Sequence, residues 1–209
     1  MCIFNNMRGK ELTVNEDCEA IELRRNQFVS VPEEVPKTIK HLDISDNLIR
    51  EIDTAEFKNI EMLDLGYNLL QEHDSIRNET LKELYLMAND ISAISESIKY
   101  CINLEKFDIA TNRLREIENL KFITTNIKEI YLGANKISEF NINLNHLTNL
   151  KIVDLQFNNL KEFDCALLPE SVDTLLLNNN RNLVTIKNTR KFKIFDYNDT
   201  KYAQTNKFS

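Results

Sequence analysis

The chain has 209 residues, of which 42% are apolar and 28% are charged, a composition typical of a folded protein rather than a disordered one. Its formal charge of −7 at pH 7 and its pI of about 5.1 argue against general binding to nucleic acid or to anionic membranes. Only three glycines and three prolines are present, which argues against a loop-rich all-β sandwich and against glycine-rich phosphate loops.

An eleven-residue pattern, LxxLxLxxNxL, recurs along the chain, and its positions are numbered here from one to eleven. Eight copies follow one another, from CEAIELRRNQF (18–28) through LKELYLMANDI (81–91) to VDTLLLNNNRN (172–182). The asparagine at position nine returns every 21 to 23 residues. The eight asparagines are Asn26, Asn47, Asn68, Asn89, Asn112, Asn135, Asn158 and Asn180.

This pattern resembles the leucine-rich repeat family, and the resemblance covers residues 18–187. It implies an α/β fold, a leucine-rich repeat solenoid of about eight repeats. The expected shape is a curved horseshoe with a parallel β-sheet on the concave face and short helices or 3₁₀ turns on the convex face. We therefore divide the chain into an N-terminal cap segment (1–17), the solenoid (18–187), and a C-terminal cap strand with a frayed tail (188–209).

Strand alternation assigns a direction to each residue of the repeat. In residues 81–91, Leu84 and Leu86 point inward and Tyr85 points outward, because side chains alternate with a period of two. Asn89 follows the strand where the chain must turn and backbone groups lose their ladder partners. An amide side chain both donates and accepts, so we expect the asparagines to bond the turns of their own and adjacent repeats. Their predicted role is structural.

The N-terminal region resembles the capping region of extracellular leucine-rich repeat proteins, through Cys18 and the VPEEVP segment (31–36). The family cap carries paired cysteines; here Cys2 and Cys18 are available, and spacing alone does not decide whether they pair. Cys101 and Cys165 fall in convex returns of different repeats and are expected to be free. Most of the cysteines being free favours a reducing compartment.

No apolar run of about 18 residues exists, so we expect no membrane span. The first residues, MCIFNNMRGKELTV, lack the hydrophobic core of a signal peptide. These observations favour a cytoplasmic location. The alternative is a secreted protein whose signal peptide lies upstream of this chain.

Along the convex side, His73 stands where the pattern calls for an aliphatic residue, and we expect it to be partly exposed or locally hydrogen-bonded. The returns at 92–103, 118–126 and 141–149 are long enough for a short helix. After Asn180 an extra residue precedes Leu183, and the alternation of Phe192, Ile194 and Asp196 predicts a final strand. The last segment, AQTNKFS, is expected to fray.

The basic end of the chain carries seven Lys and Arg residues against two Asp from Arg181 onward, a local charge of +5 (7 − 2). A docking surface would explain this charge, but we favour a solvated terminal segment.

Nothing in the sequence indicates catalysis. His41, His73 and His146 fall in different repeats and at different structural positions, so no triad can be assembled on one face. There is no CxxC, no HExxH and no glycine-rich phosphate loop. We therefore expect a non-enzyme without a metal or a cofactor.

The outward residues of the concave face carry the functional hypothesis. Small residues such as Gly66, Ala88 and Gly133 keep its floor shallow, and aromatic residues rise around them. Exposed aromatics and methionine with interspersed carboxylates are typical of protein-binding hot spots. The expected partner-binding residues are Tyr67, Tyr85, Met87, Asp108, Tyr131, Asp154 and Phe157.

We therefore expect a monomeric, non-catalytic module that binds a protein or peptide on its concave face. The partner surface should be basic and partly apolar, because the site is acidic and aromatic. Nucleic acid is not an expected partner. Two alternatives stay open: a regulatory or targeting subunit of an enzyme of the phosphatase or GTPase type, and a secreted immune-type recognition fragment. Fold alone does not separate them.

Overall fold

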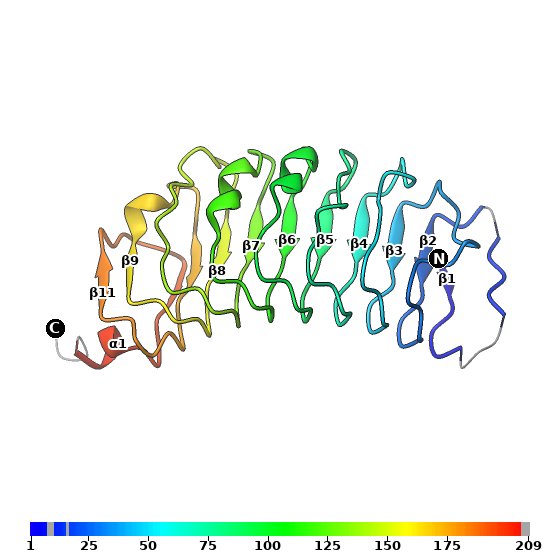
Figure 1. Cartoon of the computed structure of the whole chain (residues 1–209). Helices are drawn as coiled ribbons and strands as arrows, with labels where there is room; N and C mark the ends of the chain where they lie inside the picture. The colour runs from blue at the N-terminus through cyan, green and yellow to red at the C-terminus, as the bar shows by residue number, and fades with distance from the viewer. Residues whose placement is uncertain (8–10, 16, 206–209) are drawn as a thin grey trace.

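A computed structural model describes residues 1–7, 11–15 and 17–205. Within these residues, ten short parallel strands form one sheet in the order β1-β2-β3-β4-β5-β6-β7-β8-β10-β12 (Figure 1). Consecutive repeats thus stack without crossovers, as predicted for the solenoid. The strands are β1 (Cys2–Ile3), β2 (Ala20–Glu22), β3 (His41–Asp43), β4 (Met62–Asp64), β5 (Glu83–Tyr85), β6 (Lys106–Asp108), β7 (Glu129–Tyr131), β8 (Ile152–Asp154), β10 (Thr174–Leu176) and β12 (Ile194–Asp196).

The core runs the length of the solenoid between the sheet and the returns. Position four supplies fully buried residues such as Leu84 and Phe107, and position six supplies Leu86 and Ile109. Position five points to the opposite, outward side of the sheet, called the concave face below. The predicted inward and outward assignments are therefore confirmed.

The asparagines of position nine form a continuous ladder. Asn112 Nδ2 donates to the carbonyl oxygens of Leu86 in the preceding repeat (2.9 Å) and Ile109 in its own repeat (3.0 Å). Its Oδ1 accepts from the backbone N–H of Ile91 (3.0 Å). These contacts confirm the predicted structural role. The same three contacts recur at Asn47, Asn68, Asn89, Asn135, Asn158 and Asn180.

The convex returns are only partly helical. Short 3₁₀ helices occupy two of the three predicted places, as η1 (Glu96–Tyr100) and η2 (Glu118–Phe122). Residues 141–149 contain turns and no helix, so that prediction was wrong; the return instead joins its neighbour by the Leu144 N–H to Leu167 O bond (2.8 Å). Farther along lie η3 (Cys165–Leu167) and a two-stranded parallel sheet of β9 (Glu162–Asp164) and β11 (Thr185–Lys187).

His73 is buried rather than partly exposed, with 3% of its surface accessible. Its Nε2 accepts from the Ser95 N–H of the next repeat (2.9 Å), so its hydrogen bond is not local either. Nδ1 is buried without a hydrogen-bond partner in the described structure. Burial lowers the pKa of His73 to about 4, which keeps the imidazole neutral at pH 7.

The N-terminal end is closed by half a repeat. Strand β1 pairs with β2 in parallel, and a disulfide joins Cys2 to Cys18. The expectation that most cysteines are free is therefore wrong for this pair, because the register of β1 brings the two side chains together. Cys101 and Cys165 are free and buried, as predicted.

The C-terminal end is closed by aromatic residues. The predicted final strand is present as β12, but its phase differs from the expectation: Ile194 is 54% exposed, whereas Phe195 packs against Phe192 with ring centroids 5.0 Å apart. Tyr197 continues the stack toward Tyr202. A short helix, α1 (Lys201–Thr205), follows, and the rest of the predicted frayed tail (206–209) lies outside the described residues.

Candidate functional site

A row of position-five residues crosses the middle of the concave face. Strand pairing places Asp64 beside Tyr85, then Asp108, Tyr131 and Asp154 on successive strands from β4 to β8. Carboxylates and phenol rings thus alternate along this row, which is called the Asp–Tyr row below.

The carboxylates of the row support their own turns. Asp64 Oδ1 accepts from the N–H of Gly66 (2.8 Å), and Asp108 Oδ1 accepts from the N–H of Ala110 (3.0 Å). Burial raises the pKa of Asp64 to about 6 and raises that of Asp108. The aspartates of position five therefore have a structural use that is independent of any partner.

The tyrosines of the row have no such contact with a turn. The hydroxyl of Tyr85 donates to Glu83 Oε2 (2.6 Å), and that of Tyr131 donates to Glu129 Oε2 (2.9 Å). Burial, and then the neighbouring glutamate, raises the pKa of each phenol. Both rings are therefore held in fixed, neutral form on the surface of the sheet.

Lys106 lies between the two tyrosines and was not among the predicted site residues. Its Nζ is 5.4 Å from the ring centroid of Tyr85, 5.3 Å from that of Tyr131 and 3.2 Å from Glu129 Oε2. The first two contacts are cation–π interactions. The sequence did contain a signal, since Glu83, Lys106 and Glu129 occupy position three, two residues before the row on the same face.

Position eight gives the rim of the concave face an unusual backbone. Every residue there has a positive φ, between 52° and 60°, which disfavours bulky side chains. Two aromatic residues nevertheless occupy it: Tyr67 is 57% exposed and Phe157 is 54% exposed. They lie on turns four repeats apart and flank the Asp–Tyr row rather than touching each other.

The remaining predicted site residues differ in accessibility. Met87 is half-buried beside Gly66, where an added Cβ would lie 3.1 Å from Met87 Cγ. Asp154 is only 5% exposed, and Gln156 donates to both of its oxygens, from N to Oδ1 (2.9 Å) and from Nε2 to Oδ2 (3.0 Å). Asp154 is thus already bonded within its own repeat.

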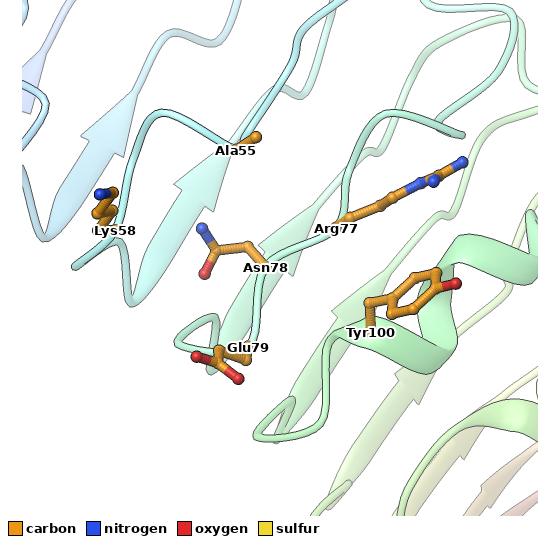
Figure 2. Close-up of a pocket in the computed structure, with 6 residues that line it drawn as sticks. All are labelled: Ala55, Lys58, Arg77, Asn78, Glu79 and Tyr100. Carbon is orange, nitrogen blue, oxygen red and sulfur yellow. The ribbon is translucent and has the colours of Figure 1, made fainter.

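A separate hollow lies among the returns, away from the Asp–Tyr row. Figure 2 shows Arg77 and Tyr100 on neighbouring returns at one side of it, and the guanidinium Cζ is 5.6 Å from the ring centroid. Asn78 Nδ2 is bonded to the carbonyl oxygens of Thr54 (3.2 Å) and Phe57 (2.7 Å), so it holds the wall together. The hollow, about 680 Å³ in volume, is an open surface feature.

The described residues also bear on metal binding and on membrane insertion. They contain no group of three or more His, Cys, Asp or Glu side chains arranged to hold a metal ion. None of their helices is long and apolar enough to cross a membrane.

Comparison with known proteins bears on the fold. No protein-family model matches the chain, and no curated protein matches it in sequence. Solved structures do match. The functional domain of InlJ from Listeria monocytogenes matches at 18% identity and a TM-score of 0.63, and the match covers 81% of this chain and 38% of the InlJ chain. The LRR ectodomain of the Arabidopsis thaliana receptor kinase GASSHO1/SCHENGEN3, solved with CASPARIAN STRIP INTEGRITY FACTOR 2, matches at 18% identity and a TM-score of 0.61, over 88% of this chain and 24% of its own.

A plant peptide hormone receptor, RGFR1 in complex with RGF2, matches at 22% identity and a TM-score of 0.58, over 79% of this chain and 31% of its own. This chain has the leucine-rich repeat fold. It spans about a third of the length of these leucine-rich repeat structures, and the identities are low. The likeness therefore describes the leucine-rich repeat architecture, while the partner has to be inferred from the surface.

Proposed function

We propose that this chain is a monomeric, non-catalytic interaction module, with residues 18–187 as its working unit, that binds a protein or peptide on the concave face. The observation that carries the proposal is the replacement of aspartate by Tyr85 and Tyr131 in the Asp–Tyr row. Asp64 and Asp108 at this position accept a hydrogen bond from the N–H of their own turn. The hydroxyls of Tyr85 and Tyr131 instead donate to a glutamate two residues earlier. A large, rigid, outward ring is the kind of side chain that anchors a partner.

The aromatic residues of the rim support the same conclusion. Tyr67 and Phe157 occupy left-handed backbone positions that favour small residues, and both leave more than half of their surface exposed. Neither residue is needed for core packing. Three solved structures of similar fold are complexes: RGFR1 with RGF2, GASSHO1/SCHENGEN3 with CASPARIAN STRIP INTEGRITY FACTOR 2, and FLRT2 with Latrophilin 3 and Unc5D.

The Cys2–Cys18 disulfide favours the secreted recognition protein over the cytoplasmic regulatory subunit, because disulfides persist in oxidising compartments. Mass spectrometry of the native protein, alkylated before reduction, tests this choice. A Cys2–Cys18 cross-linked peptide is the expected result, and alkylated Cys2 and Cys18 would favour the cytoplasm.

The binding proposal is tested with the double variant Tyr85→Ala/Tyr131→Ala. Partner proteins captured from the native source by the wild type should be lost by this variant, and the measured affinity for a captured partner should fall at least tenfold. The melting temperature should change little, since both rings lie outside the core.

The matched control is Tyr100→Ala, which removes a tyrosine that is 47% exposed in a convex return. It should bind partners as well as the wild type. Unchanged affinity of the double variant, or equal losses in both variants, would reject the concave face as the binding surface.

A further inference from the structure

Two carboxylates of the Asp–Tyr row have only one of their two oxygens hydrogen-bonded to a described residue. Asp64 and Asp108 each accept one backbone hydrogen bond at Oδ1, and no described donor bonds Oδ2 of either residue. Neither forms an ion pair with a described residue, unlike Asp43 on β3, which is paired with Arg24. The free oxygens belong to partly buried side chains, so an incoming cation would restore polar contacts that burial has removed.

Gly66 lies between the first of these carboxylates and the side chain of Met87. A Cβ added at Gly66 would lie 3.1 Å from Asp64 Oδ1, which is tighter than normal van der Waals contact. Ala110, the smallest residue with a Cβ, takes the equivalent position beside Asp108. Both residues at position seven are small, and each donates its backbone N–H to Oδ1 of the aspartate two residues before it.

The chain itself shows that the intervening rings accept a positive charge. The ammonium group of Lys106 rests on Tyr85 and Tyr131 and is bonded to Glu129, so the row already carries a cation in contact with its aromatic surface. This contact shows that the faces of the two phenol rings are compatible with a nearby positive charge.

The spacing of the two carboxylates selects the form of the partner. Asp64 and Asp108 lie two strands apart in register, with Tyr85 between them, a separation of about 9.5 Å for neighbouring strands of a sheet. In a polyproline II peptide, side chains three residues apart point the same way and are about 9.3 Å apart. In a β-extended peptide, alternate side chains are about 6.6 Å apart and would miss one of the two carboxylates.

We propose that the concave face binds an extended, polyproline II-like peptide segment that crosses the strands and carries Lys or Arg side chains three residues apart, one on Asp64 and one on Asp108. The residues between the two cations pack on Tyr85. This inference rests on the proposed function, because it requires the concave face to be the binding surface, and it adds the charge, conformation and spacing of the partner.

Two synthetic peptides of equal composition and charge test the spacing. One contains Arg-Pro-Pro-Arg, and the other contains Arg-Arg-Pro-Pro; both are capped at the ends and titrated by NMR at 0.15 M salt. The peptide with cations three residues apart should bind at least fivefold more tightly. Equal affinities, or no binding by either peptide, would overturn the proposal.

Matched variants locate the contact. Asp64→Asn and Asp108→Asn keep the oxygen that accepts the turn N–H but remove the charge. Each should lower the affinity for the Arg-Pro-Pro-Arg peptide at least threefold. Asp53→Asn is the control outside the row, because the exposed Asp53 of a return likewise accepts one backbone N–H at Oδ1, from Ala55 (2.9 Å), and it should leave binding unchanged. Equal effects of all three variants would show attraction by overall charge alone.

The two proposals fail in different ways. If Tyr85→Ala/Tyr131→Ala abolishes capture of native partners while the two peptides bind alike, the interaction module stands and the cation spacing is wrong. If the double variant keeps its partners, the concave site itself is wrong.

Discussion

Positions eight and nine are neighbours in every repeat and meet opposite requirements. Position nine is asparagine in all eight copies, and from Asn47 to Asn180 its side chain is buried and bonded to two repeats. Position eight varies from Arg25 to Phe157, yet every residue there has the same left-handed backbone. The fold constrains the side-chain chemistry of one position and only the backbone of the next.

This difference separates structural from functional residues. Where only the backbone is constrained, Gly or Asn would be the least strained choice. Two of the eight repeats instead carry Tyr67 or Phe157, both largely exposed. The proposed binding of a partner on the concave face accounts for these two aromatic residues, which the fold neither favours nor buries.

Asn112→Ala is the substitution with the largest expected effect on position nine. It leaves the buried N–H of Ile91 without its acceptor and removes one of the two amide donors to the carbonyl oxygens of Leu86 and Ile109, so the free energy of unfolding should fall by about 3 kcal/mol. Urea denaturation measures the change. The control is Thr111→Ala in the same turn, whose exposed side chain should matter by less than about 0.5 kcal/mol. Similar losses of unfolding free energy in Asn112→Ala and Thr111→Ala would contradict the structural role given to position nine alone.

His73 extends the comparison to a buried polar group that is only half bonded. Its pKa of about 4 in the folded protein lies below the ordinary 6.5, so the unfolded chain binds the extra proton first as pH falls. Its contribution to stability is complete above pH 6.5 and is lost as pH falls through 4, a total of about 3 kcal/mol.

The pH prediction is measured by urea denaturation of the wild type and His73→Leu between pH 7 and pH 4. The wild type should lose about 3 kcal/mol more than the variant over this range. The opposite contribution of Asp64, whose pKa is raised to about 6, is common to both proteins and cancels. If the wild type and His73→Leu lose the same unfolding free energy between pH 7 and pH 4, His73 is accessible to protons in the folded state.

Phe157→Gly has the smallest expected effect and gives the finest test of position eight. Glycine accepts the positive φ without steric cost, so the variant should be more stable than the wild type by about 1 kcal/mol. Its affinity for a captured partner should nevertheless fall. Ala88→Gly is the control, because it has the same backbone but loses only a methyl group. A loss of stability in Phe157→Gly would make this ring a structural residue.

The sequence was sufficient to predict the features that repeat. The period and alternation placed Leu84 in the core, Tyr85 on the surface and Asn89 in the ladder, because each copy faces the same environment. Features that occur once were harder to predict. The Cys2–Cys18 pairing depends on a two-residue strand, and the contact of Lys106 with two rings depends on side-chain conformation across three strands.

The C-terminal strand was misphased for a related reason. Phe192, Phe195, Tyr197 and Thr200 do follow positions one, four, six and nine of the pattern, but none of them is leucine or asparagine. Counting alternate residues from Phe192 gives Ile194 and Asp196, whereas counting from Phe195 gives Tyr197, so the sequence allowed two phases. Only the pairing of Phe195 with Leu175 decided between them.

A molecule built by translating one unit risks continuing to polymerise, with the end of one copy stacking on the start of the next into a filament. The ladder described above is interrupted at both ends. Register places Met7 at position nine of the half repeat that contains β1, and a thioether cannot donate to the carbonyls of a preceding copy. At the other end the side-chain hydroxyl of Thr200 donates to Tyr197 O and accepts from the Ala203 N–H, both within its own segment. Head-to-tail stacking of two copies would therefore leave the joint without the amide contacts that join the repeats inside the chain.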